Sequence, residues 1–191
     1  MQWRPVTPET WKDFLAVMGP RGGDAGCWCM WYRLKSSEFG ESEGEERQAM
    51  MKEIIDAGPP PGLIGYRDGV PVGWVQVGPR EQYGRLGRSR VTKPLDDRRA
   101  WGVTCFVVPK KHRRQGVAGE LLQAAVEYAG EQGAELVEGY PVEPRDGGAP
   151  DFWSWMGFAS MFRSCGFEEA ARRSETRPFM RLELDDSSGP A

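Results

Sequence analysis

The sequence lacks any apolar run approaching the roughly 20 residues that span a bilayer, and residues 1–5 contain no apolar core of a signal peptide. We therefore expect no transmembrane segment, no membrane partner and no secreted precursor. Internal repeats are also missing. Coiled-coil and collagen-like chains are excluded, because both depend on a repeating sequence.

An excess of positive charge is also absent. The 25 Lys and Arg residues are outnumbered by 28 Asp and Glu residues, and the sequence pI is about 5.4. Nucleic-acid-binding proteins usually carry a general positive field, so we expect no nucleic-acid partner. The basic residues instead cluster locally, over 85–99 and 110–114, which suits a small polyanion. An RNA-binding module using 110–114 is an alternative, and its binding would depend steeply on salt.

Cysteine and histidine are scarce. The four cysteines, without a signal peptide, indicate free thiols and a cytoplasmic location. Cys27 and Cys29 are separated by one residue rather than the two to four usual in zinc sites, so we expect no metal. His112 is the one histidine and would be needed in any Ser–His or Cys–His mechanism. A solvated loop position is its simpler interpretation, and Cys105 is expected to be a small buried apolar residue.

What the sequence does contain is typical of one compact domain of 191 residues, with eight Trp and eight Met adding apolar bulk. We expect a single domain over 1–185 and a flexible C-terminal tail over 186–191. Hydrophobic periodicity separates helices from strands, and Asp68-Gly69 is typical of a two-residue hairpin turn. In chain order it predicts a strand (3–6), a helix (7–18), a helix (42–56), a hairpin (63–67 and 70–77), a loop with one helical turn (78–97), a strand (101–108), a helix (116–131), a strand (135–140), a helix (158–163), a further short strand (167–171) and a last strand (179–184). This order predicts a mixed α/β sheet with helices on its faces.

The junction between the strand over 104–108 and the helix after it carries the clearest chemical signal. N–H groups of a first helical turn have no partner inside the helix, and the helix dipole adds positive potential there. Gly116, Ala118 and Gly119 have no large side chain to hold a phosphate away, while Arg113 and Arg114 add charge. The sequence therefore predicts a pyrophosphate site at this turn.

Neither a P-loop nor a dinucleotide-binding glycine motif is present. Instead, Arg113-x-x-Gly116-x-Ala118 directly after an apolar strand resembles the acyl-CoA loop of the GNAT acyltransferase family. The segment over 162–167 is similar to the family's late aromatic-x-x-x-Gly-Phe sequence. Residues 27–33 also resemble a subgroup of bacterial GNAT proteins. The resemblance covers roughly residues 1–185.

This resemblance implies the α/β GNAT acyltransferase fold, with a mixed, mostly antiparallel central sheet splayed at a bulge and helices on both faces. It implies acetyl-CoA as co-substrate and direct attack by a primary amine, from a small molecule, a peptide or a protein. It is compatible with a homodimer. It implies that backbone groups of Phe106, Val107 and Val108 bind the pantetheine arm. It also implies that Arg113 lies beside the pyrophosphate and that backbone amides bind it, namely those of Arg114, Gln115, Gly116, Val117, Ala118 and Gly119.

Glu138 is our candidate for the catalytic base, because an amine acceptor is mainly protonated at neutral pH and must lose a proton. Strand alternation places Leu136, Glu138 and Tyr140 on one face, where a carboxylate is costly without a partner or a task. The alternative is a solvated position at the sheet edge.

Tyr140 is our candidate for the acid that protonates the leaving thiolate. The family's usual acid is a tyrosine four residues before the Gly-Phe pair, and this sequence has Phe162 there. The alternative is that Tyr140 packs and that CoA leaves as a thiolate. Phe162 also supports a rival function, a catalytically degenerate GNAT-fold module that binds acyl-CoA or another protein.

The acceptor amine is not specified by any sequence motif. Several large side chains either line a substrate cleft or pack in the core: Trp28, Met30, Trp31, Tyr32, Trp153 and Trp155. The basic residues over 85–90 either form a solvated face or contact an anionic substrate.

Overall fold

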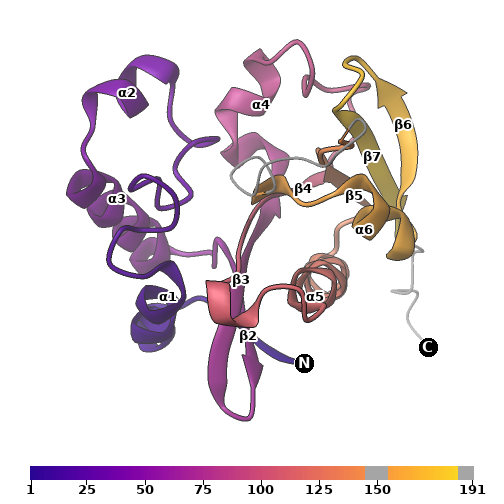
Figure 1. Cartoon of the computed structure of the whole chain (residues 1–191). Helices are drawn as coiled ribbons and strands as arrows, with labels where there is room; N and C mark the ends of the chain where they lie inside the picture. The colour runs from indigo at the N-terminus through magenta and orange to yellow at the C-terminus, as the bar shows by residue number, and fades with distance from the viewer. Residues whose placement is uncertain (145–154, 185–191) are drawn as a thin grey trace.

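The computed structural model describes residues 1–144 and 155–184. Trp153 and the expected tail over 186–191 lie outside the described residues. Within them, the central sheet has seven strands in the order β1-β2-β3-β4-β5-β7-β6 (Figure 1). The strands are β1 (Gln2–Pro5), β2 (Gly62–Arg67), β3 (Val70–Pro79), β4 (Trp101–Val107), β5 (Leu136–Gly139), β6 (Glu168–Arg172) and β7 (Pro178–Glu183).

The helices match the predicted ones closely, with one addition. They are α1 (Trp11–Met18), α2 (Ser36–Glu41), α3 (Gly44–Ala57), α4 (Gly84–Arg88), α5 (Val117–Glu131) and α6 (Ala159–Ser164), with 3-10 turns η1 (Pro8–Thr10), η2 (Arg80–Gln82) and η3 (Lys110–His112). Helix α2 was not predicted, because no buried residue marks it. A side chain of the next helix holds it in place: the buried Arg47 of α3 donates to the carbonyls of Phe39 and Ser42.

The β2–β3 hairpin turns at Asp68 and Gly69, as predicted. Both residues have a left-handed backbone, with φ of 50° and 74°. Two successive residues with positive φ match the right-handed twist of the paired strands. All neighbouring strand pairs are antiparallel except β4 and β5, which run parallel, so the sheet is mixed and mostly antiparallel.

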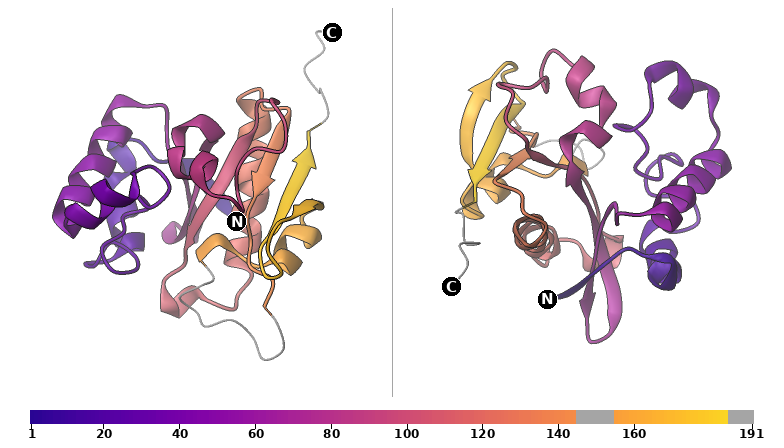
Figure 2. Two further views of the ribbon diagram at one scale, coloured as in Figure 1. Left: turned by 90° about the horizontal axis from the view of Figure 1, so that it is seen from above. Right: turned by 180° about the vertical axis from the view of Figure 1, so that it is seen from behind.

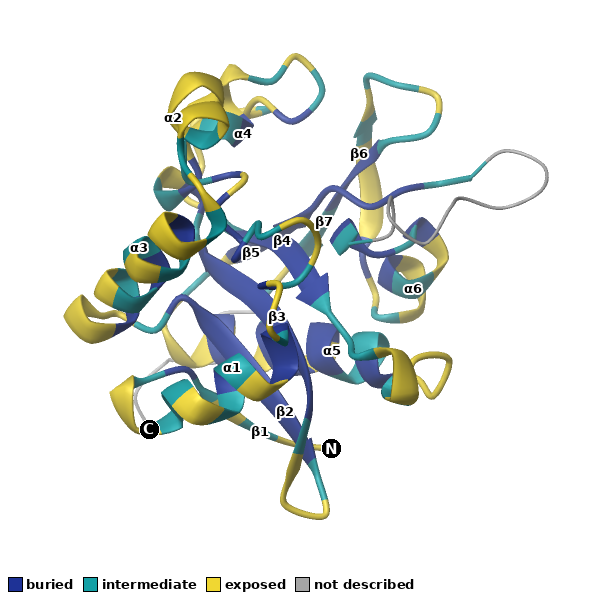
Figure 3. Ribbon diagram, turned by 60° about the vertical axis from the view of Figure 1, so that its left-hand side comes forward, coloured by how far each residue is buried: buried dark blue, intermediate teal, exposed yellow. Residues whose placement is uncertain are grey.

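Helices cover both faces of the sheet, with α5 on one side and α1 and α3 on the other (Figure 2). Strand alternation divides β3 between these layers. Val75 and Val77 belong to the apolar cluster around α5, whereas Trp74 packs with Phe14 and Met51 on the opposite face. Buried residues therefore fill the middle strands, while the outer surfaces of α2 and α3 are largely exposed (Figure 3).

A bulge interrupts the pairing of β3 with β4. Gln76 pairs with Cys105 and Val77 pairs with Val103, which leaves Thr104 as an extra residue in β4. The parallel pairing of β4 with β5 covers only residues 101–103 and 137–139. Beyond Val103 the two strands diverge, so the splay expected from the family resemblance is present.

Close packing of α6 on β5 depends on Gly139. A Cβ atom at this position would lie 2.0 Å from Cε1 of Phe162, which is fully buried. We expect Gly139→Ala to lower the free energy of unfolding by about 1–3 kcal/mol, the usual cost of overpacking a core. Urea unfolding measures this change.

Gly87→Ala is the matched control, because nothing lies within 4 Å of a Cβ atom there. Alanine also favours the helical backbone of α4. Equal losses of stability in the two variants would contradict the packing argument.

Candidate active site

A cleft of about 1860 Å³ opens where β4 and β5 diverge. The end of β4, the turn after it and the beginning of α5 form one wall. The other wall comes from the segment over 16–32, the loop over 89–92 and the residues at the ends of β5 and β7. The cleft therefore has one half beside the basic turn before α5 and a second half made mainly of loops.

The half beside the basic turn contains the uncapped start of α5. Gly116 caps α5 with a left-handed backbone (φ 79°), and Arg114 is also left-handed (φ 59°). No side chain of the described residues caps α5, so the first-turn N–H groups are available to a ligand. A Cβ atom at Gly116 would meet only Oε1 of Glu120, at 3.8 Å.

Nine of the ten predicted cofactor-binding residues line this half. They are Phe106, Val107, Val108, Arg113, Arg114, Gly116, Val117, Ala118 and Gly119. Gln115 does not line it: its carbonyl accepts from Arg67 at 2.9 Å, and its side chain donates to the Lys111 carbonyl at 3.0 Å. His112 is half-buried in η3 and lines the cleft, so it is not the solvated loop residue that we expected.

The carboxylate nearest to this turn is compensated. Glu120 forms ion pairs with Arg67 and with the N-terminal amine. Hydrogen bonds from these two cations outweigh the opposing effect of burial and hold the pKa of Glu120 below its usual value. Lys110, Arg113 and Arg114 therefore dominate the local charge, which favours a diphosphate.

Glu138 and Tyr140 lie in contact, but of the two only Tyr140 lines the cleft. Glu138 is 1% exposed, and it is absent from the described lining of the cleft, whereas Tyr140 lines it. Oε1 of Glu138 accepts from Arg181 at 2.7 and 3.0 Å, and Oε2 accepts from the Tyr140 hydroxyl at 2.8 Å and from Arg80. Burial, followed by the charge of Glu138, raises the pKa of Tyr140 well above its usual value.

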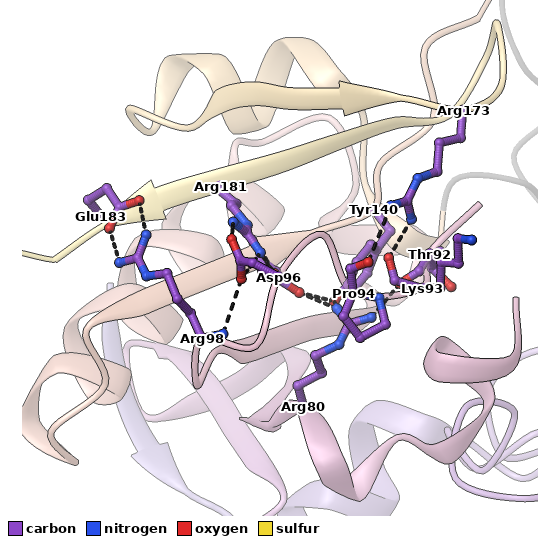
Figure 4. A network of polar contacts seen from close by, with 11 residues as sticks. Arg80, Thr92, Lys93, Pro94, Asp96, Arg98, Tyr140, Arg173, Arg181 and Glu183 are labelled. Atoms are coloured by element: carbon purple, nitrogen blue, oxygen red, sulfur yellow. Dashed lines mark hydrogen bonds and ion pairs between the residues drawn. The ribbon is translucent and has the colours of Figure 1, made fainter. Parts of the chain in front are cut away.

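These side chains belong to a larger network that anchors the loop over 89–98 (Figure 4). Arg80 donates to the Thr92 carbonyl, and Arg181 also pairs with Asp96. Arg173 of the segment after β6 donates to the carbonyls of residues 93 and 94. The network therefore fixes the loop that supplies one wall of the cleft.

The segment over 27–32 contributes to both the core and the cleft. Trp28 and Met30 pack against the α1 and α3 layer, while Cys29, Trp31 and Tyr32 line the cleft. Trp28 and Cys29 both have positive φ, which is uncommon for residues other than glycine, so this segment is a turn and not an extended strand. Both interpretations left open by the sequence therefore hold, for different residues.

Tyr32 is a functional candidate that the sequence analysis named only as a lining or packing residue. It is 8% exposed, and its hydroxyl donates to the sulfur of Met156 at 3.1 Å. Burial raises the pKa of Tyr32 to about 12. The hydroxyl thus stays protonated at neutral pH, and its acceptor in the described part of the chain, the Met156 sulfur, is a weak one.

Two of the thiols that line the cleft, Cys27 and Cys105, resist ionisation. Sγ of Cys29 and Sγ of Cys105 are 3.3 Å apart, and Trp74 Nε1 donates to Cys29 at 3.2 Å. Burial raises the pKa of Cys27 to about 11, and contact with Cys29 together with burial raises that of Cys105. Since the thiolate is the nucleophile and the metal ligand, these cysteines are suited to packing. The described residues contain no group of three or more His, Cys, Asp or Glu side chains placed to hold a metal ion.

Comparison with known proteins then identifies the family. Residues 28–158 match the sequence model of the Acetyltransferase (GNAT) family. The chain belongs to this family. No curated protein matches the sequence significantly.

Solved structures of GNAT proteins share the fold. The ribosomal-protein-alanine N-acetyltransferase from Brucella melitensis is 18% identical, with a TM-score of 0.54, over 96% of this chain and all of that one. A GNAT-family acetyltransferase from Listeria monocytogenes is 12% identical, with a TM-score of 0.58, over 96% of this chain and 94% of that one. The NatC complex bound to Gag peptide and CoA is 10% identical, with a TM-score of 0.53, over 96% of this chain and 98% of that one.

Two further observations concern the packing of Phe162 and the length of the helices. Phe162, at the position of the family's usual tyrosine, is fully buried and packs edge-on against Phe106 and Phe167. In the part of the chain that the structure describes, no helix has the length and apolar character needed to cross a membrane.

Glu138→Gln should destabilise the protein strongly, because it leaves Arg80 and Arg181 facing a neutral side chain in a buried site. Removing one member of a buried ion pair costs about 3–5 kcal/mol. Glu183→Gln is the control, since Glu183 pairs with Arg98 while both side chains remain largely exposed. We expect little change in its urea midpoint, and equal effects of the two substitutions would contradict a structural role for Glu138.

Proposed function

We propose that this protein transfers the acetyl group of acetyl-CoA to a primary amine by direct attack. The observation that carries the proposal is the uncapped, glycine-started end of α5 beside the part of β4 that no longer pairs with β5. The nitrogen lone pair attacks the thioester carbon, so an N–C bond forms as the C–S bond breaks. The amine loses one proton and the leaving thiolate gains one, which yields an acetamide and free CoA.

The residues present fit the diphosphate and the pantetheine arm of acetyl-CoA. Amides at the beginning of α5 would bind the diphosphate, and Arg113 and Arg114 would add charge beside it. Backbone groups of Phe106, Val107 and Val108 would bind pantetheine, because β4 extends beyond its pairing with β5. These roles repeat the expectation from the family resemblance.

Glu138 fits the role of a positioning residue better than that of the base. Its two oxygens already accept from two guanidinium groups and a tyrosine hydroxyl. The carboxylates among the described cleft residues are Asp24 and Glu120, and the second is paired with cations at the cofactor end. We therefore propose that the amine loses its proton to Asp24 or to solvent, so that kcat/KM rises with pH toward the pKa of the amine.

Two tyrosines compete for the role of acid. The Tyr140 proton is directed at a buried carboxylate, so donating it elsewhere breaks a strong charge-assisted bond. Tyr32 gives up only a bond to a thioether sulfur. We propose Tyr32 as the acid and assign Tyr140, our first candidate, to support of the network.

Binding of acetyl-CoA and its consumption test the proposed function. Gly116→Val should weaken acetyl-CoA about tenfold or more, because a β-branched residue cannot keep the left-handed backbone that aims the helix amides. Isothermal titration measures the affinity. Gly133→Val is the matched control, since Gly133 has nearly the same φ (78°) just after the far end of α5 with nothing near a Cβ atom.

Equal affinity in the two valine variants would mean that the phosphates bind elsewhere. Absence of binding by the wild type at millimolar acetyl-CoA would defeat the proposal. Binding without release of free thiol across a panel of amines would instead support the rival, a degenerate module that binds acyl-CoA.

The choice of acid is tested by Tyr32→Phe and Tyr140→Phe. We expect Tyr32→Phe to lower kcat at least tenfold while acetyl-CoA affinity stays unchanged, and Tyr140→Phe mainly to lower stability. Because the pKa of Tyr32 is about 12, the acid stays protonated and wild-type kcat should show no alkaline decline below pH 10. The opposite ranking of the two variants in kcat would restore Tyr140 as the acid.

A further inference from the structure

The side chains on the loop side of the cleft limit which acceptor amines fit there. Aromatic side chains dominate this side, including Trp31, Tyr32, Phe39, Trp155 and Phe179. The charged residues of this wall that the structure describes are Arg21, Asp24 and Arg177. A polyamine or aminoglycoside carries several cations that need carboxylate partners when desolvated. This wall suits an amine on an apolar, aromatic body instead.

Gln76 provides a polar group on this side of the cleft that points to a more specific ligand. It lies on β3, is 1% exposed and lines the cleft. Its Oε1 accepts from the Thr104 hydroxyl at 2.9 Å, which fixes the orientation of the amide. Its Nε2 is buried and has no hydrogen-bond partner among the described residues. Such an orphaned donor costs about 1–3 kcal/mol, so a ligand that accepts from it would recover that cost.

The position of Gln76 relates this donor to the reaction. Gln76 pairs with Cys105 of β4, next to Phe106 and Val107, whose backbone we assign to the thioester arm. By strand alternation its side chain shares a face of β3 with Trp74. The opposite side of β3 is the one covered by α5 (Figure 1). An acceptor oxygen bound by Nε2 would therefore lie beside the part of β4 to which we assign the thioester arm.

We propose that the acceptor is a primary amine on an aromatic body with an oxygen a few bonds from the nitrogen, and that Gln76 Nε2 donates to that oxygen. An aromatic α-amino acid amide has this chemistry. This inference rests on the proposed acetyl transfer and names the substrate class of the same cleft. Gln76 would orient the amine toward the thioester carbon and exclude amines that lack the oxygen.

A substrate pair and a matched variant test the inference. Thiol release from acetyl-CoA is followed with phenylalanine amide, which has the oxygen, with 2-phenylethylamine, which lacks it, and with spermidine and kanamycin as polycations. For the wild type we expect kcat/KM to be about tenfold higher for phenylalanine amide than for 2-phenylethylamine, equivalent to about 1.4 kcal/mol. Both should exceed the polycations at least tenfold.

Gln76→Met removes the donor at nearly the same volume and should abolish the preference for phenylalanine amide over 2-phenylethylamine. Gln48→Met, on α3 and outside the cleft lining, should keep it. Gln76→Glu retains an oxygen for the Thr104 hydroxyl but no donor, and it decides the question if the methionine variant fails to fold. Unchanged acetyl-CoA affinity shows that a variant is folded.

The outcomes separate the inference from the proposed function. If no amine releases thiol, acetyl transfer itself fails. If spermidine or kanamycin is the best acceptor, or if the Gln76 variants lose activity equally with both aromatic amines, acetyl transfer stands and the inference is overturned.

Discussion

One additional residue in β4 shapes the rest of this molecule. Thr104 has no counterpart in β3, and just before it β4 stops pairing with β5. Unpaired strand backbone is costly when buried, and in this chain it borders a cleft instead. The basic turn before α5, the aromatic wall and the amide of Gln76 all line the cleft at this divergence. The bulge therefore determines where chemistry is possible as well as how the sheet bends.

A second constraint is electrostatic and lies behind the cleft. Glu138 between Arg80 and Arg181 is a buried charge cluster in which each oxygen has at least two donors. Buried charges of this kind contribute little net stability, but they are costly to leave incomplete. Through Arg80 and Asp96 the cluster holds the loop over 89–98 against the sheet. Glu138, the base that we expected from the sequence, thus lies at the centre of a buried ion-pair network.

Local signals in the sequence predicted most of the fold. Asp68-Gly69 determines its own hairpin, and helix α5 follows directly from its apolar periodicity. The start of α5 at Gly116 is equally local, because the glycine, the arginines and the helix N-terminus are consecutive in the sequence. Glu138 shows where this stops: its partners Arg80 and Arg181 are 58 and 43 residues away, so its surroundings depend on strand order. The sequence does mark Gln76 as unusual, because it is a single amide side chain in an apolar strand. Nothing local in the sequence showed that its Nε2 lacks a hydrogen-bond partner among the described residues.

The packing of Phe162 has a bearing on how this chain could change over time. Its ring touches Phe106 and Phe167, and the places where Cβ atoms would sit on Gly139 and Gly157 are within 3.0 Å of ring carbons. A tyrosine there would place its hydroxyl in a fully buried site, and a buried hydroxyl left without a partner costs about 1–3 kcal/mol. Under the proposed function, proton delivery in this chain therefore depends on other hydroxyls, such as that of Tyr32 on the aromatic wall.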